Sequence, residues 1–133
     1  MLNSKKAEYL IIGGYAVGFY GYPRATADLD IWIATGKENA VKVAEVLKEF
    51  GFNLPEVTPE VFQKKDKVIR MGNPPLRIEI LTSISGVDFD KAYSERAIES
   101  IEGLTVNLIS LENLKINKKA SGRHKDLDDL EHL

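Results

Sequence analysis

Residues 24–33 are Arg-Ala-Thr-Ala-Asp-Leu-Asp-Ile-Trp-Ile. They predict a β-strand, because β-branched, aromatic and apolar residues follow the two aspartates. Successive side chains of a strand point to opposite faces, so Asp28 and Asp30 share one face while Leu29 and Ile31 share the other. Two like charges about 6–7 Å apart repel each other. A divalent cation such as Mg2+, which prefers carboxylate oxygens, would stabilise this pair.

The composition limits the class of protein. The chain has 133 residues, of which 44% are hydrophobic and 29% charged, which predicts one domain over residues 1–133 with a sizeable core. A net charge of -2 and a pI of about 5.7 argue against strong generic binding of nucleic acid. The absence of cysteine excludes a disulfide, a thiolate zinc site and a cysteine nucleophile. We expect a cytoplasmic protein without membrane contact, because the sequence has neither a membrane-span pattern nor a signal-peptide pattern.

The order of expected elements predicts an α/β (α+β) fold, with a mixed sheet flanked by helices. We expect a core over residues 8–109 and a C-terminal helical pair over residues 110–133. Thr35, with Glu38 three residues later, predicts the start of the second helix, while Ser110 predicts the start of the C-terminal pair. Strands are expected over residues 9–12, 24–34, 67–71, 76–82, 97–101 and 104–109.

Two further features lie outside the aspartate strand. Glu79 is an acid on the strand over residues 76–82, and it can meet the two aspartates if that strand joins their sheet. Gly13-Gly14 separates a strand from a short helix, where free backbone N–H groups and the helix dipole attract phosphate. The alternative for the glycine pair is a tight turn that requires a positive φ.

These parts favour phosphoryl or nucleotidyl transfer. Three carboxylates on neighbouring strands suit two divalent ions, one activating a hydroxyl and one neutralising the leaving phosphate. Arg24 and lysines of the C-terminal helix could bind a triphosphate through charge-assisted hydrogen bonds. Positioning and electrostatics do most of the catalysis in such reactions.

The same residues match a known family. Residues 10–16 (Leu-Ile-Ile-Gly-Gly-Tyr-Ala), residues 21–31 and the strand Arg77-Ile78-Glu79-Ile80-Leu81 resemble the DNA polymerase β-like nucleotidyltransferase superfamily. Residues 111–127 resemble the closing motif of its small bacterial and archaeal branch, which includes AbiEii-type toxins and minimal nucleotidyltransferases. The resemblance covers nearly the whole chain. In two places the sequence departs from the usual pattern, with Tyr15 after the glycine pair and Glu79 as the third acid.

The resemblance implies roles for individual residues. Asp28, Asp30 and Glu79 would hold Mg2+, with Mn2+ as an alternative, and Glu79 would also help to orient or deprotonate the acceptor hydroxyl. The remaining candidates would serve the phosphates of an NTP, with ATP expected. They are Gly13 and Gly14 for the β/γ-phosphates, Arg24 and Thr26 for the metal and phosphate loop, and Lys115 for a nucleotide phosphate.

Several of these residues also have structural interpretations. Arg24 could form an ion pair with one of the aspartates. The lysines at 115, 118 and 119 could form a solvated helix face, and Lys125 with Asp129 has the spacing of an exposed pair. Trp32 shares the face of the aspartates, where it could either pack beside a cleft or stack on a base.

The first functional hypothesis is a Mg2+-dependent nucleotidyltransferase that moves an NMP from an NTP to a hydroxyl of a protein, RNA or small molecule and releases pyrophosphate. The alternative is a non-catalytic nucleotide-binding or antitoxin-type module of a toxin–antitoxin pair. A third hypothesis, a tRNA-modifying toxin, requires an RNA-binding surface that the acidic pI does not favour. A protein partner or a homodimer could complete the acceptor site, because no separate acceptor domain follows the core.

Overall fold

A six-stranded mixed sheet forms the centre of the structure, a computed structural model that describes residues 2–21, 28–73, 76–101 and 103–133. The strand order is β3-β4-β2-β1-β6-β5, with β2–β4 and β1–β6 parallel and the other neighbours antiparallel. The strands are β1 (Tyr9–Ile12), β2 (Asp28–Ile33), β3 (Val68–Asn73), β4 (Leu76–Leu81), β5 (Ala97–Ile101) and β6 (Leu104–Leu108). The predicted mixed sheet with flanking helices is confirmed.

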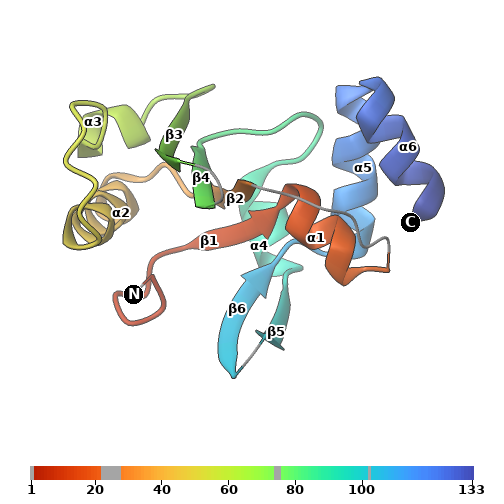
Figure 1. The fold of residues 1–133 in the computed structure, drawn as a ribbon, viewed down its shortest axis with the longest axis horizontal. Coiled ribbons are helices and arrows are strands. Elements are labelled where there is room, and N and C mark those ends of the chain that lie inside the picture. Colours follow the sequence, from red (N-terminus) through yellow and green to blue (C-terminus); the bar gives the residue numbers. More distant parts are fainter. Residues whose placement is uncertain (1, 22–27, 74–75, 102) are drawn as a thin grey trace.

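Six helices in the described residues accompany this sheet (Figure 1). They are α1 (Gly13–Phe19), α2 (Lys37–Glu49), α3 (Pro59–Phe62), α4 (Phe89–Ser94), α5 (Leu111–Ser121) and α6 (His124–His132). In the view of Figure 1, α2 and α3 lie at the left end of the molecule and α5 and α6 at the right. None of the helices in these ranges is both long and apolar enough to cross a membrane.

The helix ends follow local sequence signals in part. Ser110 accepts a hydrogen bond from the backbone N–H of Asn113 at 3.1 Å, as its position predicts. Gly122 ends α5 with a left-handed φ of 64°. The prediction for Thr35 is wrong, because α2 begins after Gly36 and has no side-chain cap.

The two faces of the sheet differ in polarity. Leu29 and Ile31 of β2 line an apolar pocket together with Val43 and Leu47 of α2. The aspartates of β2 point to the other face, because side chains alternate along a strand. The buried core therefore fixes which face of β2 carries its acids.

Trp32 has the parity of the aspartates but belongs to the core. It is 1% exposed, and its ring meets Phe89 of α4 edge to face, with the ring centroids 5.0 Å apart. Of the two alternatives for this residue, the structure supports packing and excludes a free face for stacking on a base.

Candidate active site

The parallel pairing of β2 with β4 places Glu79 beside the strand that carries the two predicted aspartates. Asp28 lies opposite Arg77 and Asp30 lies opposite Glu79 in this register. All three carboxylates therefore share one face of the sheet. The sequence places Glu79 on a strand, but only the register makes it the neighbour of Asp30.

Two arginines, which sequence reasoning did not assign to the site, bind two of these acids. Arg77 Nε lies 3.0 Å from Asp28 Oδ1, and Arg70 Nε lies 2.7 Å from Glu79 Oε1. Arg70 comes from β3, where it lies opposite Glu79 in the antiparallel register. Within the described residues, no three histidine or acidic side chains stand together as a ready metal-binding group.

Within the part of the chain that the structure describes, no arginine forms an ion pair with Asp30. Its Oδ1 is buried and has no hydrogen-bond partner among the described residues. Burial, followed by the negative charges of Glu79 and Asp28, raises the pKa of Asp30 to about 6, against the opposing effect of Lys125. A bound cation would relieve both the burial cost and the repulsion, and carboxylate oxygens are the donors that Mg2+ and Mn2+ prefer. The residues present therefore fit a divalent cation beside Asp30.

Gly13 lies directly against this carboxylate. Its φ of +67° is in the left-handed region, and a Cβ built at this position would overlap Asp30 Oδ2. Gly14 follows in the first turn of α1, and neither an N-cap side chain nor an acidic residue covers that turn. Both the turn and the close approach of Asp30 thus require glycine at position 13.

A cleft of about 500 Å³ opens over the acidic face. It lies between the sheet, the loop over residues 83–85 and the junction of α5 with α6. The sheet and α1 side supplies Ile12, Gly13, Gly14, Asp30, Arg70 and Glu79. The helical side supplies Asn117, Lys118, Ala120, Ser121, Arg123, Lys125 and Asp126.

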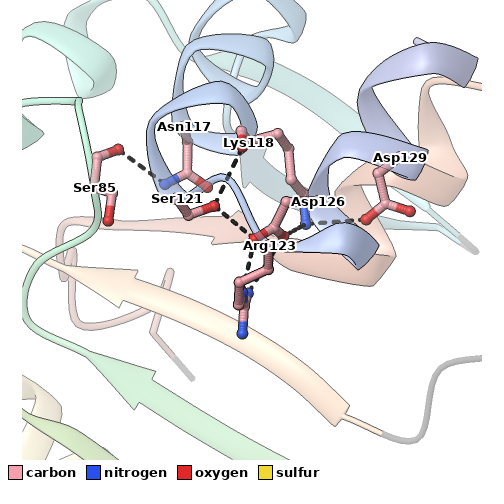
Figure 2. Close-up of polar contacts among 7 residues, drawn as sticks. All are labelled: Ser85, Asn117, Lys118, Ser121, Arg123, Asp126 and Asp129. Carbon is pink, nitrogen blue, oxygen red and sulfur yellow. Dashed lines mark hydrogen bonds and ion pairs between the residues drawn. The ribbon is translucent and has the colours of Figure 1, made fainter.

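A buried ionic network joins the two C-terminal helices (Figure 2). Lys118 Nζ lies 3.1 Å from both Asp126 Oδ1 and Asp129 Oδ2, and its side chain is 6% exposed. Ser121 Oγ donates a hydrogen bond of 2.7 Å to Asp126 Oδ2. Burial alone would raise the pKa of Asp126, but hydrogen bonds from Arg123, Ser121 and Lys118 hold it well below its usual range.

Asp126 of this network also binds the guanidinium group of Arg123, which lines the cleft. Arg123 donates to both oxygens of Asp126, from Nε at 2.7 Å and from Nη2 at 3.3 Å, yet its side chain remains 71% exposed. Hydrogen bonding to Asp126 and the charge of Asp126 raise the pKa of Arg123, and the charge of Asp30 adds to this effect. Arg123 and Lys125 thus form the cationic side of a cleft whose floor carries carboxylates.

A family model described as "Nucleotidyl transferase of unknown function (DUF2204)" matches residues 1–133. The chain belongs to this nucleotidyltransferase family. A solved structure from Thermotoga maritima, described as a "putative nucleotidyltransferase", matches with a TM-score of 0.63 and 18% identity, covering 98% of this chain and 83% of that chain. At that identity the match supports the fold. No curated protein matches the sequence.

The remaining candidate residues of this nucleotidyltransferase family member are Arg24, Thr26 and Lys115. Arg24 and Thr26 fall outside the described residues. Lys115 is a partly buried residue of α5 and does not line the cleft, whereas Lys125 does. The exposed-pair interpretation of Lys125 with Asp129 is wrong, because Asp129 is buried and pairs with Lys118.

The solvated-face interpretation also fails for Lys118. A sequence signal was available, since two aspartates three residues apart follow the glycine that ends α5. A turn at that glycine folds them back toward the preceding helix.

Proposed function

We propose that this chain is a divalent-cation-dependent nucleotidyltransferase that moves an NMP from an NTP to a hydroxyl group. The observation that carries the proposal is the buried, unbonded Oδ1 of Asp30 on the floor of a cleft that also holds Glu79, Gly13, Arg123 and Lys125. This arrangement provides donors for a hard cation and positive charges for phosphates within the same cleft.

In the proposed reaction, the acceptor hydroxyl oxygen forms a bond to the α-phosphorus of the NTP. The bond from that phosphorus to the β-phosphate oxygen breaks, and pyrophosphate leaves with the electron pair. The hydroxyl proton passes to a base, for which Glu79 is the candidate. A bound Mg2+ or Mn2+ supplies charge neutralisation on the phosphates and lowers the pKa of the attacking hydroxyl.

The residues of the chain have separate tasks in this proposal. Asp28, Asp30 and Glu79 would hold the cation. Gly13 keeps the backbone close to the carboxylate of Asp30, where a side chain would displace it. Arg123, whose guanidinium Nε and Nη2 donate to the buried Asp126, would orient the phosphates through its other N–H groups.

The proposal extends to the branch of the family, the partner and the nucleotide. The closing motif over residues 111–127 resembles that of the AbiEii-type branch, which supports membership of that branch, and a protein partner or second copy would complete the acceptor site. ATP is the expected nucleotide. The non-catalytic antitoxin-type module remains the alternative, and it predicts binding of a partner without transfer of an NMP.

Calorimetry with each NTP in the presence of Mg2+ or Mn2+ tests the proposal. We expect binding by the wild type and its loss in the double variant Asp28→Ala/Asp30→Ala. The control Glu56→Ala/Glu131→Ala removes two exposed acids and should bind as the wild type does. Absence of binding with all four NTPs and both ions would contradict the proposal.

A second experiment identifies the acceptor. Each NTP labelled at the α-phosphate is incubated with the protein, Mg2+ and a cell lysate, and the labelled molecules are then separated. We expect label on one class of molecule, lost in Asp28→Ala/Asp30→Ala. Binding of nucleotide without any transfer of label would favour the non-catalytic alternative.

A further inference from the structure

The acidic face of the sheet carries its own counter-ions. Across β3, β4 and β2, Arg70 lies opposite Glu79 and Glu79 lies opposite Asp30, while Arg77 lies opposite Asp28. Three carboxylates and two guanidinium groups thus share one face of the sheet. A cation that binds these carboxylates must compete with the arginines for them.

Arg70 and Arg77 differ in how exposed they are and in whether they line the cleft. Arg70 lies on β3, at the edge of the described sheet, and its side chain is 65% exposed, whereas that of its partner Glu79 is 16% exposed. Arg77 lies on the inner strand β4 and is 38% exposed. Arg70 lines the cleft, and Arg77 is not among the lining residues. Arg70 is therefore the arginine that can exchange its partner within the cleft.

We propose that Arg70 is a nucleotide-binding residue that pairs with Glu79 in the metal-free protein and moves to the phosphates of the nucleotide when a divalent cation binds Glu79. This inference rests on the proposed function. The exchange replaces one charge-assisted pair of Arg70 by another, because a carboxylate and a phosphate both accept hydrogen bonds from a guanidinium group.

The position of Arg70 supports the second half of the exchange. Arg123 and Lys125 line the helical side of the cleft, and Arg70 lines the sheet side. Cations would then face a bound triphosphate from both walls, with the glycine turn of α1 at the same cleft. Without the exchange, Arg70 would continue to hold an oxygen of Glu79 that the cation requires.

The exchange predicts opposite effects on two ligands. In Arg70→Gln without nucleotide, Mn2+ should bind about two- to fivefold more tightly, the range of a partly exposed ion pair that no longer competes. With Mn2+ in excess, the same variant should bind α,β-methylene analogues of the NTPs roughly tenfold more weakly, because a charge-assisted phosphate contact is lost.

Both affinities are measured by calorimetry, with free Mn2+ confirmed by electron paramagnetic resonance. Arg70→Lys keeps the charge and should restore most of the analogue affinity, although it lacks the bidentate geometry. Lys64→Gln removes one exposed positive charge outside the cleft and should leave both affinities unchanged. Circular dichroism and urea unfolding check that each variant is folded.

The outcomes separate this inference from the proposed function. Unchanged or weaker Mn2+ binding by folded Arg70→Gln overturns the competition at Glu79. Tighter Mn2+ binding with unchanged analogue affinity overturns the move to the phosphates. Failure of the wild type to bind any NTP or analogue overturns the proposed function as well, whereas wild-type binding that Arg70→Gln leaves unaltered overturns the inference alone.

Discussion

The charge of Asp126 holds the C-terminal helices together, and Asp126→Asn tests this directly. The substitution preserves size but removes the charge from a side chain that is 1% exposed. Because the pKa of Asp126 is held well below its usual range, the wild-type carboxylate is ionised at neutral pH. We therefore expect the variant to lose the ionic part of the network without leaving a cavity.

The expected loss in the free energy of unfolding follows from the contacts of Asp126. Asp126 accepts hydrogen bonds from Lys118, Ser121 and Arg123, whereas asparagine has one acceptor oxygen and would turn an NH2 group toward these donors. Removal of one partner from a buried ion pair costs about 3–5 kcal/mol. Lys118 keeps Asp129 at 3.1 Å, so we expect a loss near the lower end, about 3 kcal/mol.

The assay is urea unfolding at pH 7, repeated at lower pH. Since the pKa of Asp126 is lower in the folded than in the unfolded protein, its contribution is present above about pH 4 and is lost as the pH falls through the folded-state pKa. The difference in the free energy of unfolding between wild type and variant should therefore become smaller below about pH 4. Asp128→Asn, an exposed substitution on the same helix, should change the free energy of unfolding by less than about 0.5 kcal/mol.

A loss below about 1 kcal/mol for Asp126→Asn would refute the reasoning, because it would equal the effect of an exposed ion pair. An equal loss for Asp128→Asn would refute it too, since the effect would then come from helix charge and not from the buried network. A gap that widens toward acid pH would contradict the sign derived from the lowered pKa.

Two further predictions concern the acidic face. In EDTA, Asp30→Asn should raise the free energy of unfolding by about 1–2 kcal/mol at pH 7, less than the shift in pKa alone implies because Asp30 is partly solvated. The gain should shrink as the pH falls from about 6 to about 4, since the raised pKa means that the folded protein then keeps a proton on Asp30; urea titrations that show a constant gain would contradict this. Gly13→Ala should lower the free energy of unfolding by at least about 1 kcal/mol and weaken Mn2+ binding, because the new Cβ would displace Asp30. Gly18→Ala, where a Cβ would meet open space, should leave the free energy of unfolding unchanged or raise it, and should leave Mn2+ binding unchanged.

The period of two in β2 and β4 was sufficient to predict which residues share a face. Asp28 and Asp30 alternate with apolar residues, which predicted the acidic face of the sheet, and Ile78 and Ile80 predicted the apolar face opposite it. The parallel register of β2 with β4 was not predictable, because it depends on how the chain crosses between them. The contact between Glu79 and Asp30 therefore required the structure.

Ion pairs between residues far apart in the sequence were predicted least well. Lys118 lies between other lysines in the sequence, so local charge favours a solvated face, yet tertiary packing of α6 buries it against two aspartates. Arg70 and Arg77 have the strand parity of the acids, but parity alone does not show that arginines will pair with them. Both failures arise from long-range pairing, which periodicity does not encode.

The polarity of the acidic face changes along β2, and this limits where a nucleotide can lie. Asp28 and Asp30 occupy its first half, whereas Trp32, two residues further on the same face, is buried against Phe89 of α4. The cleft includes Asp30 but not Trp32. Among the described parts of the cleft, the loop over residues 83–85 and the α5–α6 junction would face a bound base, and no described aromatic residue lines these walls. The described lining of the cleft therefore offers a base hydrogen bonds and no aromatic ring for stacking.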